Sequence, residues 1–118
     1  KKIYFITLNQ WFDESLLKEI SLQPIYFPSI NKDNYDEFVK TYHKTFDEYP
    51  NQLSFLSYDL VGLVYYLTVQ NNFNIDKKMF LKKNMFKGKI GIFEVKNNKI
   101  SHLLNFYKVE DNNFKKIF

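Results

Sequence analysis

The sequence predicts an α/β fold made of a β-α-β unit, two long helices, a short helix and a β-hairpin. Three patterns predict it. An apolar, β-branched run over residues 3–8 is typical of a strand in a parallel sheet. Helical periodicity occupies residues 34–69 and is interrupted at Pro50, and strand-like sequence returns over residues 90–109.

Composition restricts the class of protein. The 118 residues are enough for one small domain with one core. A hydrophobic content of 45% and an aromatic content of 19% exclude a disordered chain. The lack of Cys removes disulfides, thiolate metal sites and a Cys nucleophile, and it leaves the redox compartment open. The chain opens with Lys1-Lys2 and no initiator Met, which suggests a segment of a larger protein.

The first elements form the β-α-β unit. We expect the strand over residues 3–8 to be covered by helices on both faces, because it has no polar side. Asp13 can cap a short helix, and Pro24–Pro28 is a second short strand. The apolar positions of the short helix recur at three- and four-residue steps: Leu16, Leu17 and Ile20.

Two long helices follow. Asn34 and Glu37 have the spacing of a capping box, and Pro50 ends the helix that they begin. An aromatic and apolar stripe runs along it: Tyr35, Phe38, Val39, Tyr42, Phe46 and Tyr49. The second helix, Leu53–Val69, is apolar on every side, so we expect it to be buried. Its polar interruptions, such as Asp59, favour a protein core over a membrane span, and Asp59 must find partners there.

The remainder is β structure after a short helix capped by Asp76. We expect Ile90–Val95 and Ile100–Val109 to pair as a hairpin across Lys96–Lys99, where two Asn residues tolerate a tight turn. A second turn over residues 110–113 and a last strand over residues 114–118 follow, and the sequence does not indicate which strand the last one pairs with.

The formal charge of +4 comes from an excess of Lys in the second half of the chain. The Lys residues concentrate in one segment: Lys77, Lys78, Lys82, Lys83, Lys87 and Lys89. This segment could meet phosphate or an anionic membrane, although a solvated Lys-rich surface is the simpler interpretation. Since there is no Arg, the usual residue for reading base edges, we expect no nucleic-acid partner.

The order of these parts resembles the last third of a type I periplasmic solute-binding protein. The matching motifs are Phe38-x-x-x-Tyr42, Pro50, the pair Tyr58-Asp59 and Phe86-x-Gly88-x-x-Gly91-x-Phe93. A closing aromatic strand, Asn105–Val109, completes the pattern, and the match covers nearly the whole chain as one segment, 1–118. The Asn9-Gln10-Trp11 sequence, with Pro24–Pro28 behind it, looks closest to an α-proteobacterial branch of penicillin-binding-protein activators.

The resemblance implies a fold and a function. It implies the C-terminal portion of a three-layer, leucine-binding-like fold, with the first strands in one lobe and the two long helices in the other. It implies a non-enzymatic, periplasmic receptor that binds a small polar or amino-acid-like ligand, without a cofactor or a metal, for ABC transport or sensing. The alternative is an activator of cell-wall synthesis that uses the same fold for protein–protein contact. A membrane permease, a cell-wall synthase or a second copy of the chain are the possible protein partners.

The candidate ligand-binding residues are Asn9, Gln10, Trp11, Phe55 and Tyr58. The first three follow a strand, where α/β sheets bind ligands. Amides and an indole there differ from the acidic residue that relatives use for an ammonium group. Phe55 and Tyr58 match a region where relatives bring an aromatic ring to the cleft, and packing is the competing interpretation for Phe55, Tyr58 and Trp11. The two histidines, His43 and His102, have no neighbouring ligand set.

Overall fold

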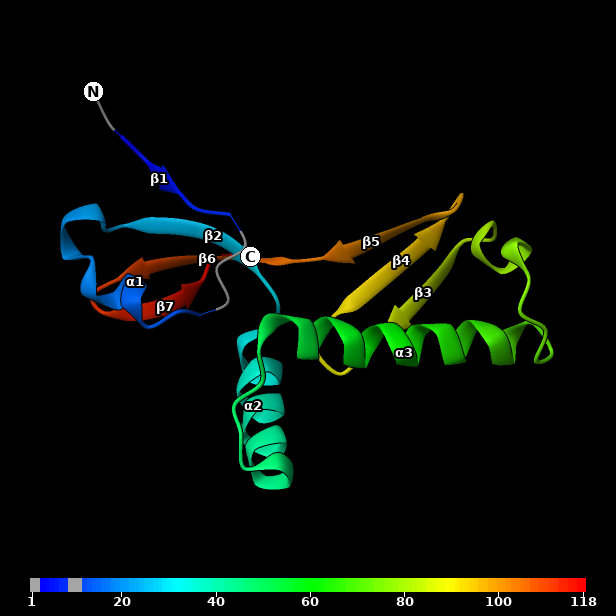
Figure 1. Cartoon of the computed structure of the whole chain (residues 1–118). Coiled ribbons are helices and arrows are strands. Elements are labelled where there is room, and N and C mark those ends of the chain that lie inside the picture. Colours follow the sequence, from blue (N-terminus) through cyan, green and yellow to red (C-terminus); the bar gives the residue numbers. More distant parts are fainter. Residues whose placement is uncertain (1–2, 9–11) are drawn as a thin grey trace. The chain divides into compact units, whose positions relative to one another are not determined.

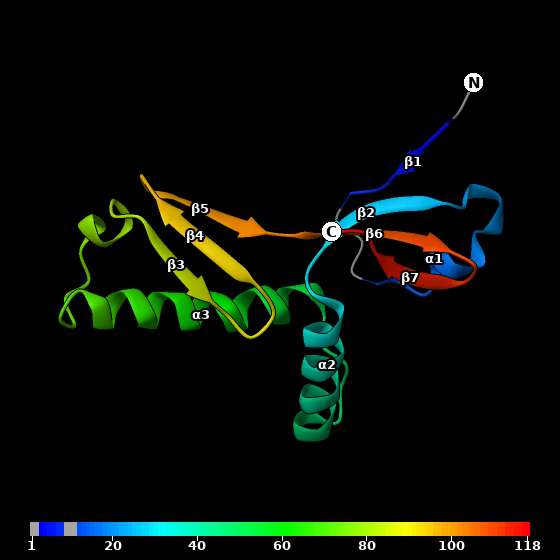
Figure 2. The same ribbon diagram turned by 180° about the vertical axis from the view of Figure 1, so that it is seen from behind.

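The computed structural model describes residues 3–8 and 12–118 and has a mixed helix and sheet structure. The chain forms two compact units. Unit 1 comprises residues 1–32 and 104–118, and unit 2 comprises residues 33–103. Figures 1 and 2 show the elements of both units from opposite sides. The coarse α/β prediction agrees with this mixture of helices and strands.

The elements have the following bounds. In unit 1 they are β1 (Phe5–Ile6), α1 (Ser15–Lys18), the 3-10 helix η1 (Ile20–Leu22), β2 (Ile25–Ser29), β6 (Asn105–Glu110) and β7 (Asn113–Lys116). In unit 2 they are α2 (Lys32–Phe46, whose first residue belongs to unit 1), α3 (Gln52–Gln70), the 3-10 helix η2 (Lys77–Phe80), β3 (Asn84–Lys87), β4 (Ile92–Lys96) and β5 (Lys99–Leu103).

Unit 1 is built on a four-stranded sheet with the order β1-β2-β6-β7. β1 and β2 are parallel and are joined through α1, which confirms the predicted β-α-β unit. β2 pairs antiparallel with β6, which places Phe27 opposite Tyr107. β7 pairs with β6 across a turn at Asp111 and Asn112, which both have positive φ, and this supplies the pairing that the sequence left open.

An aromatic cluster forms the core of unit 1. Phe12 meets Tyr107 edge-on, with ring centroids 4.9 Å apart, and lies 5.5 Å from Phe114. Phe27 stacks on Tyr107 at 5.8 Å. The Tyr107 hydroxyl accepts a hydrogen bond from the backbone N–H of Lys32 at 3.0 Å, so the buried phenol has a polar partner. A fully buried Phe of this kind stabilises the unit by about 2 to 3 kcal/mol.

The first strand differs from the prediction. β1 has two residues instead of six, and its side chains are exposed, whereas the sequence predicts a strand covered on both faces. The exposed residues include Ile3, Tyr4, Phe5 and Ile6. Within the described part of the chain, no helix long enough to cover them belongs to unit 1, because α1 has only one turn. The apolar run therefore stays exposed, because nothing described in unit 1 buries it.

The start of α2 also differs from the prediction. The helix begins at Lys32, so Asn34 lies within its first turn and the Asn34–Glu37 capping box is wrong. It ends at Phe46, because Asp47 has a positive φ of 56°, and Pro50 follows three residues later. The predicted stripe is present, and Phe38 is its buried member.

The second long helix, α3, has the predicted extent but is less buried than predicted. The Asn51 side chain caps it by accepting a hydrogen bond from the Ser54 N–H at 3.0 Å. Its buried residues form one stripe at four-residue steps: Phe55, Asp59, Leu63 and Leu67. The other faces expose large apolar side chains, among them Leu53, Leu60 and Val61. Within the described residues, no helix combines the length and the hydropathy that crossing a membrane requires.

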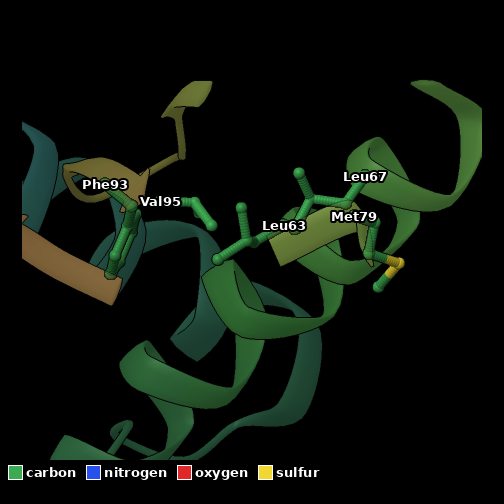
Figure 3. Packing of buried hydrophobic residues seen from close by; sticks show 5 residues of the cluster. All are labelled: Leu63, Leu67, Met79, Phe93 and Val95. Atoms are coloured by element: carbon green, nitrogen blue, oxygen red, sulfur yellow. The ribbon is translucent and has the colours of Figure 1, made fainter. Parts of the chain in front are cut away.

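Unit 2 packs α3 against the antiparallel sheet β3-β4-β5. Figure 3 shows the contact: Leu63 and Leu67 from α3 meet Phe93 and Val95 from β4, with Met79 of η2 beside them. Asp76 caps η2 as predicted, accepting a hydrogen bond from the Lys78 N–H at 3.1 Å. The core of unit 2 is therefore one helix stripe on one face of a small sheet.

The predicted hairpin is confirmed as β4 and β5, but its second strand is shorter than predicted. Asn97 and Asn98 both have positive φ, as a tight turn requires. The predicted strand Ile100–Val109 divides at Leu104, because β5 pairs with β4 in unit 2 and β6 pairs with β2 in unit 1. Strand-like sequence on both sides of Leu104 does not reveal such a change of sheet.

A buried carboxylate joins α3 to the β3–β4 turn. Asp59 is only 1% exposed, and its two oxygens accept hydrogen bonds from the backbone N–H groups of Lys89, Ile90 and Gly91 at 2.7, 3.1 and 3.2 Å. Three N–H donors satisfy a charge that would otherwise be costly to bury. Asp59 therefore finds its predicted partners, and they are backbone groups of the turn.

Two glycines permit this close approach. A Cβ atom at Gly88 would overlap the Asp59 carboxylate, and one at Gly91 would overlap the His102 ring. Neither glycine has a positive φ, so the requirement is for space and not for backbone conformation. The Gly-x-x-Gly spacing of the sequence is thus explained by the two side chains that lie against the turn.

We predict that Asp59→Asn destabilises the chain by about 2 to 4 kcal/mol, because the amide offers one acceptor oxygen to three buried donors and adds an N–H₂ group facing them. Urea unfolding followed by circular dichroism measures the change. Asp47→Asn is the matched control, since Asp47 is exposed and its positive φ suits Asn. Equal stability of the two variants would contradict the assigned role of Asp59.

We predict that Gly88→Ala costs about 1 to 3 kcal/mol, because the new methyl group must displace the Asp59 carboxylate. The control is Gly62→Ala in α3, where the new atom would lie 3.0 Å from the tip of Phe86. That ring can move, and Ala favours a helix over Gly by about 0.5 to 1 kcal/mol. The same unfolding assay should therefore show a loss for the first variant and almost none for the second.

Candidate functional site

A groove in unit 2 runs between α2 and α3 and is the candidate site. Its volume is about 850 Å³. The residues that line it are Phe38, Thr41, Tyr42, Thr45 and Phe46 from α2, Ser54, Ser57, Tyr58, Val61, Gly62 and Tyr65 from α3, and Lys89 from the β3–β4 turn. The lining is mostly apolar and aromatic and includes a few hydroxyl groups, which is the usual composition of a binding pocket.

The two helix sequences explain the groove. The aromatic stripe of α2 extends beyond the part of the helix that packs against α3. At its exposed end, the rings of Tyr42 and Phe46 contact each other, with centroids 4.6 Å apart, and line the groove. On α3 the small residues Ser54, Ser57 and Gly62 leave room beside the larger ones. The excess of aromatic residues on one face of α2 was the sequence signal for a surface beyond the core, and the sequence prediction did not use it.

Tyr58 is the predicted site residue that the structure places in the groove. Its side chain is 60% exposed, and its ring meets the ring of Phe38 edge-on at 5.3 Å. An aromatic ring that is supported from one side and open on the other can offer its free face to a ligand. Contact of Tyr58 with a ligand stays a prediction.

Phe55 lies in the core. It is 2% exposed and contacts Phe38 at 4.6 Å and Tyr35 at 5.1 Å, stacked on the latter. In this arrangement its ring has almost no surface to offer a ligand, and its position agrees with packing, the competing interpretation of the sequence. Adjacent turns of one helix thus send Phe55 into the core and Tyr58 into the groove.

The other three predicted site residues, Asn9, Gln10 and Trp11, lie outside the described residues. They follow β1 and precede α1 in the sequence of unit 1. Their role in ligand binding stays a prediction from the sequence.

Lys89 brings a charge to the groove. Its ammonium group lies 2.6 Å from a carboxylate oxygen of Glu37 on α2, and this hydrogen bond is the main cause that raises the pKa of Lys89. The backbone of the same residue donates to Asp59 on α3. Lys89 therefore links the turn to both helices, and its charge stays present throughout the physiological pH range.

The groove offers groups that suit binding. Hydroxyl groups from Thr and Ser residues accompany aromatic rings, and Lys89 is already paired with Glu37. Across the described ranges, no group of three or more His, Asp or Glu side chains is arranged to hold a metal ion. His43 lies stacked on Tyr49 at 4.5 Å, and Tyr49 does not line the groove. The hydroxyls of Thr41, Thr45 and Ser54 already donate to other groups of the chain. The arrangement can therefore bind an aromatic or apolar group, with these hydroxyls as hydrogen-bond acceptors.

His102 lies on β5, and its ring is close to Gly91 of the β3–β4 turn. Its ring stacks on Phe93 with centroids 4.3 Å apart, and its Nε2 atom is buried and has no hydrogen-bond partner among the described residues. Burial lowers the pKa of His102 from its ordinary value of 6.5, although the charge of Asp59 opposes this in part. The folded chain therefore favours the neutral ring.

We predict that the free energy of unfolding falls as the pH drops below about 6.5, because the unfolded chain then binds a proton at His102 that the folded chain resists. The loss ends below the lowered pKa of the folded state, where both states are protonated. Urea midpoints between pH 5 and 8 measure it, and NMR titration of the His102 ring gives its pKa directly. His102→Gln should remove this part of the pH dependence, and an unchanged profile would contradict the assignment.

We compared the chain with known protein families, curated proteins and solved structures. No protein-family model matches the chain, and no curated protein and no solved structure is significantly similar to it.

Proposed function

We propose that this chain is the C-terminal part of a type I solute-binding receptor, a non-enzymatic periplasmic protein that binds a small polar or amino-acid-like ligand for ABC transport or sensing. The observation that supports the proposal is the path of the chain. It leaves unit 1 at Lys32, forms unit 2, and returns to unit 1 at Leu104. Repeated passage between two compact units is the connectivity that a hinged, two-lobed clamp needs.

The motifs behind the resemblance have a physical explanation in unit 2. Asp59, from the Tyr-Asp pair, binds the N–H groups of the turn that begins at Gly88 and ends at Gly91. The two motifs therefore depend on each other, although they are separated by about 30 positions in the sequence. One contact that joins both motifs supports the resemblance more strongly than either motif alone.

Each of the two units offers a candidate place for ligand contact. One is the segment Asn9–Trp11 after β1, and the other is Tyr58 in the groove. Amide and indole groups, a phenol and nearby Ser and Thr hydroxyls suit a ligand that carries hydrogen-bonding groups on a small apolar frame.

Exposed apolar surface supports a second candidate, an activator that contacts a cell-wall synthase. Leu53 and Leu60 are exposed on α3 outside the groove lining, whereas Val61 is exposed within it, so a small ligand in the groove would leave Leu53 and Leu60 uncovered. Apolar patches of this kind mark protein–protein contacts. A second copy of the chain could cover the same surface, and light scattering would reveal such self-association.

Calorimetry of the complete protein with amino acids, small organic acids and peptidoglycan fragments tests the receptor. We expect heat of binding for one member of this panel, and we expect Trp11→Ala and Tyr58→Ala each to weaken it by about tenfold, the loss typical of an aromatic anchor. Tyr49→Ala is the control, because Tyr49 is an exposed tyrosine that does not line the groove.

The outcomes separate the two candidates. Binding that depends on Trp11 and Tyr58 supports the receptor. An absence of heat throughout the panel contradicts it, and retention of the protein on an immobilised synthase in the same preparation would then favour the activator. Binding that survives both substitutions would place the ligand site elsewhere in the protein.

A further inference from the structure

The part of unit 2 that contains η2 and the β4–β5 turn brings together Lys residues from two separate parts of the sequence. The helix η2 contributes Lys77 and Lys78, and the segment between η2 and β3 contributes Lys82 and Lys83. The β4–β5 turn joins them, because the Asn98 N–H donates a hydrogen bond to the Phe80 carbonyl at 3.0 Å. This turn is flanked by Lys96 and Lys99, and both views show it beside η2. We call residues 73–85 and 96–100 the basic tip.

The charge of the basic tip is mostly uncompensated. All six Lys residues are exposed. Lys83 forms an ion pair with Glu94 at 3.0 Å, and the acidic residue within the tip is Asp76, which caps η2. For Lys77, Lys78 and Lys82 no ion pair occurs within the described ranges of the chain. A surface with this excess of positive charge attracts anionic partners.

Large apolar side chains stand among these Lys residues. Phe73 is 72% exposed and Ile75 is 81% exposed. Leu81, Met85 and Ile100 are also exposed. A polyanion such as a nucleic acid would neutralise the charge but would leave these side chains in water. An anionic lipid surface matches both properties, since phosphate groups attract the Lys residues and the acyl boundary accepts the apolar ones.

Phe73 is the most informative of the apolar residues. It has a φ of 59°, in the left-handed region that favours Gly or Asn over a bulky residue. Its N–H donates to the Thr68 carbonyl at 2.9 Å, so backbone bonds hold this conformation at the end of α3. Neither the backbone nor the core explains an aromatic residue at this position. Insertion of the ring into a lipid interface would explain it.

We propose that the basic tip binds the surface of an anionic lipid membrane, with Phe73 and Ile75 entering the interface and the Lys residues contacting lipid phosphates. Binding is peripheral and depends on ionic strength, because screening weakens the attraction of the Lys residues. This proposal does not depend on the ligand-binding function, since the tip and the groove share no residue.

Sedimentation with vesicles of phosphatidylcholine, with or without phosphatidylglycerol, tests the proposal on the complete chain. We expect binding to the anionic vesicles alone and release by salt. Replacing Lys77, Lys78, Lys82 and Lys83 by Gln should weaken binding by more than about tenfold, because each Lys near an anionic surface contributes about fivefold. The control replaces Lys18, Lys40, Lys44 and Lys116, which lie outside the tip, and removes the same charge.

A second pair of variants tests the apolar contact. Phe73→Asn with Ile75→Asn should lower binding several-fold, and Asn suits the φ of position 73. Leu8→Asn with Ile20→Asn is the control, because both residues are exposed and belong to unit 1. Circular dichroism verifies that each variant is folded.

Three results would overturn the proposal. Equal losses in both Lys variants would assign the effect to net charge. Undiminished binding of the Phe73 and Ile75 variant would show that the tip does not enter the interface. Displacement of the vesicles by an equal charge concentration of single-stranded oligonucleotide would assign the surface to nucleic acid.

Discussion

The hydrogen bonds between Asp59 and the β3–β4 turn hold unit 2 together. One carboxylate from the middle of α3 accepts three backbone N–H groups from Lys89, Ile90 and Gly91. This fixes where the sheet begins relative to the helix, so that Leu63 and Leu67 meet β4. It also positions the Lys89 side chain toward Glu37 on α2. The core, the groove and the turn of unit 2 therefore depend on a single buried charge.

Element types were predictable from the sequence, because local patterns determine them. The extent of α3, the cap at Asp76 and the turn at Asn97 and Asn98 follow from periodicity and turn chemistry. The need of Asp59 for partners was also predictable from burial. Which partners it finds was not, since a side chain–backbone contact across about 30 residues leaves no local signal. Gly88 and Gly91 indicated that the chain comes close to another group at this turn, but they did not indicate that the group is the Asp59 carboxylate.

The failed predictions about burial and strand pairing have a common cause, which is that apolar sequence indicates burial without identifying the surface that provides it. The run over residues 3–8 and the outer faces of α3 are apolar, yet they are exposed in this structure. The strand over residues 100–109 divides because its two halves pair with different partners, β4 and β2. In the sequence, Phe55 and Tyr58 looked equivalent as site residues. The structure separates them, because Phe55 lies on the buried side of α3 and Tyr58 lies on the side that lines the groove.

Two groups of exposed apolar residues in this chain differ in their backbone conformation and surroundings, and the difference limits what each group can do. Those on α3 and β1 belong to regular elements with unstrained backbone, so packing of another protein surface would bury them in the ordinary way. Phe73 and Ile75 lie in a loop, surrounded by Lys residues, and Phe73 has an unfavourable φ. A protein partner for the basic tip would need both an apolar pocket and a dense acidic rim. A membrane supplies both without a specific fold, and for that reason the lipid surface is the simpler partner.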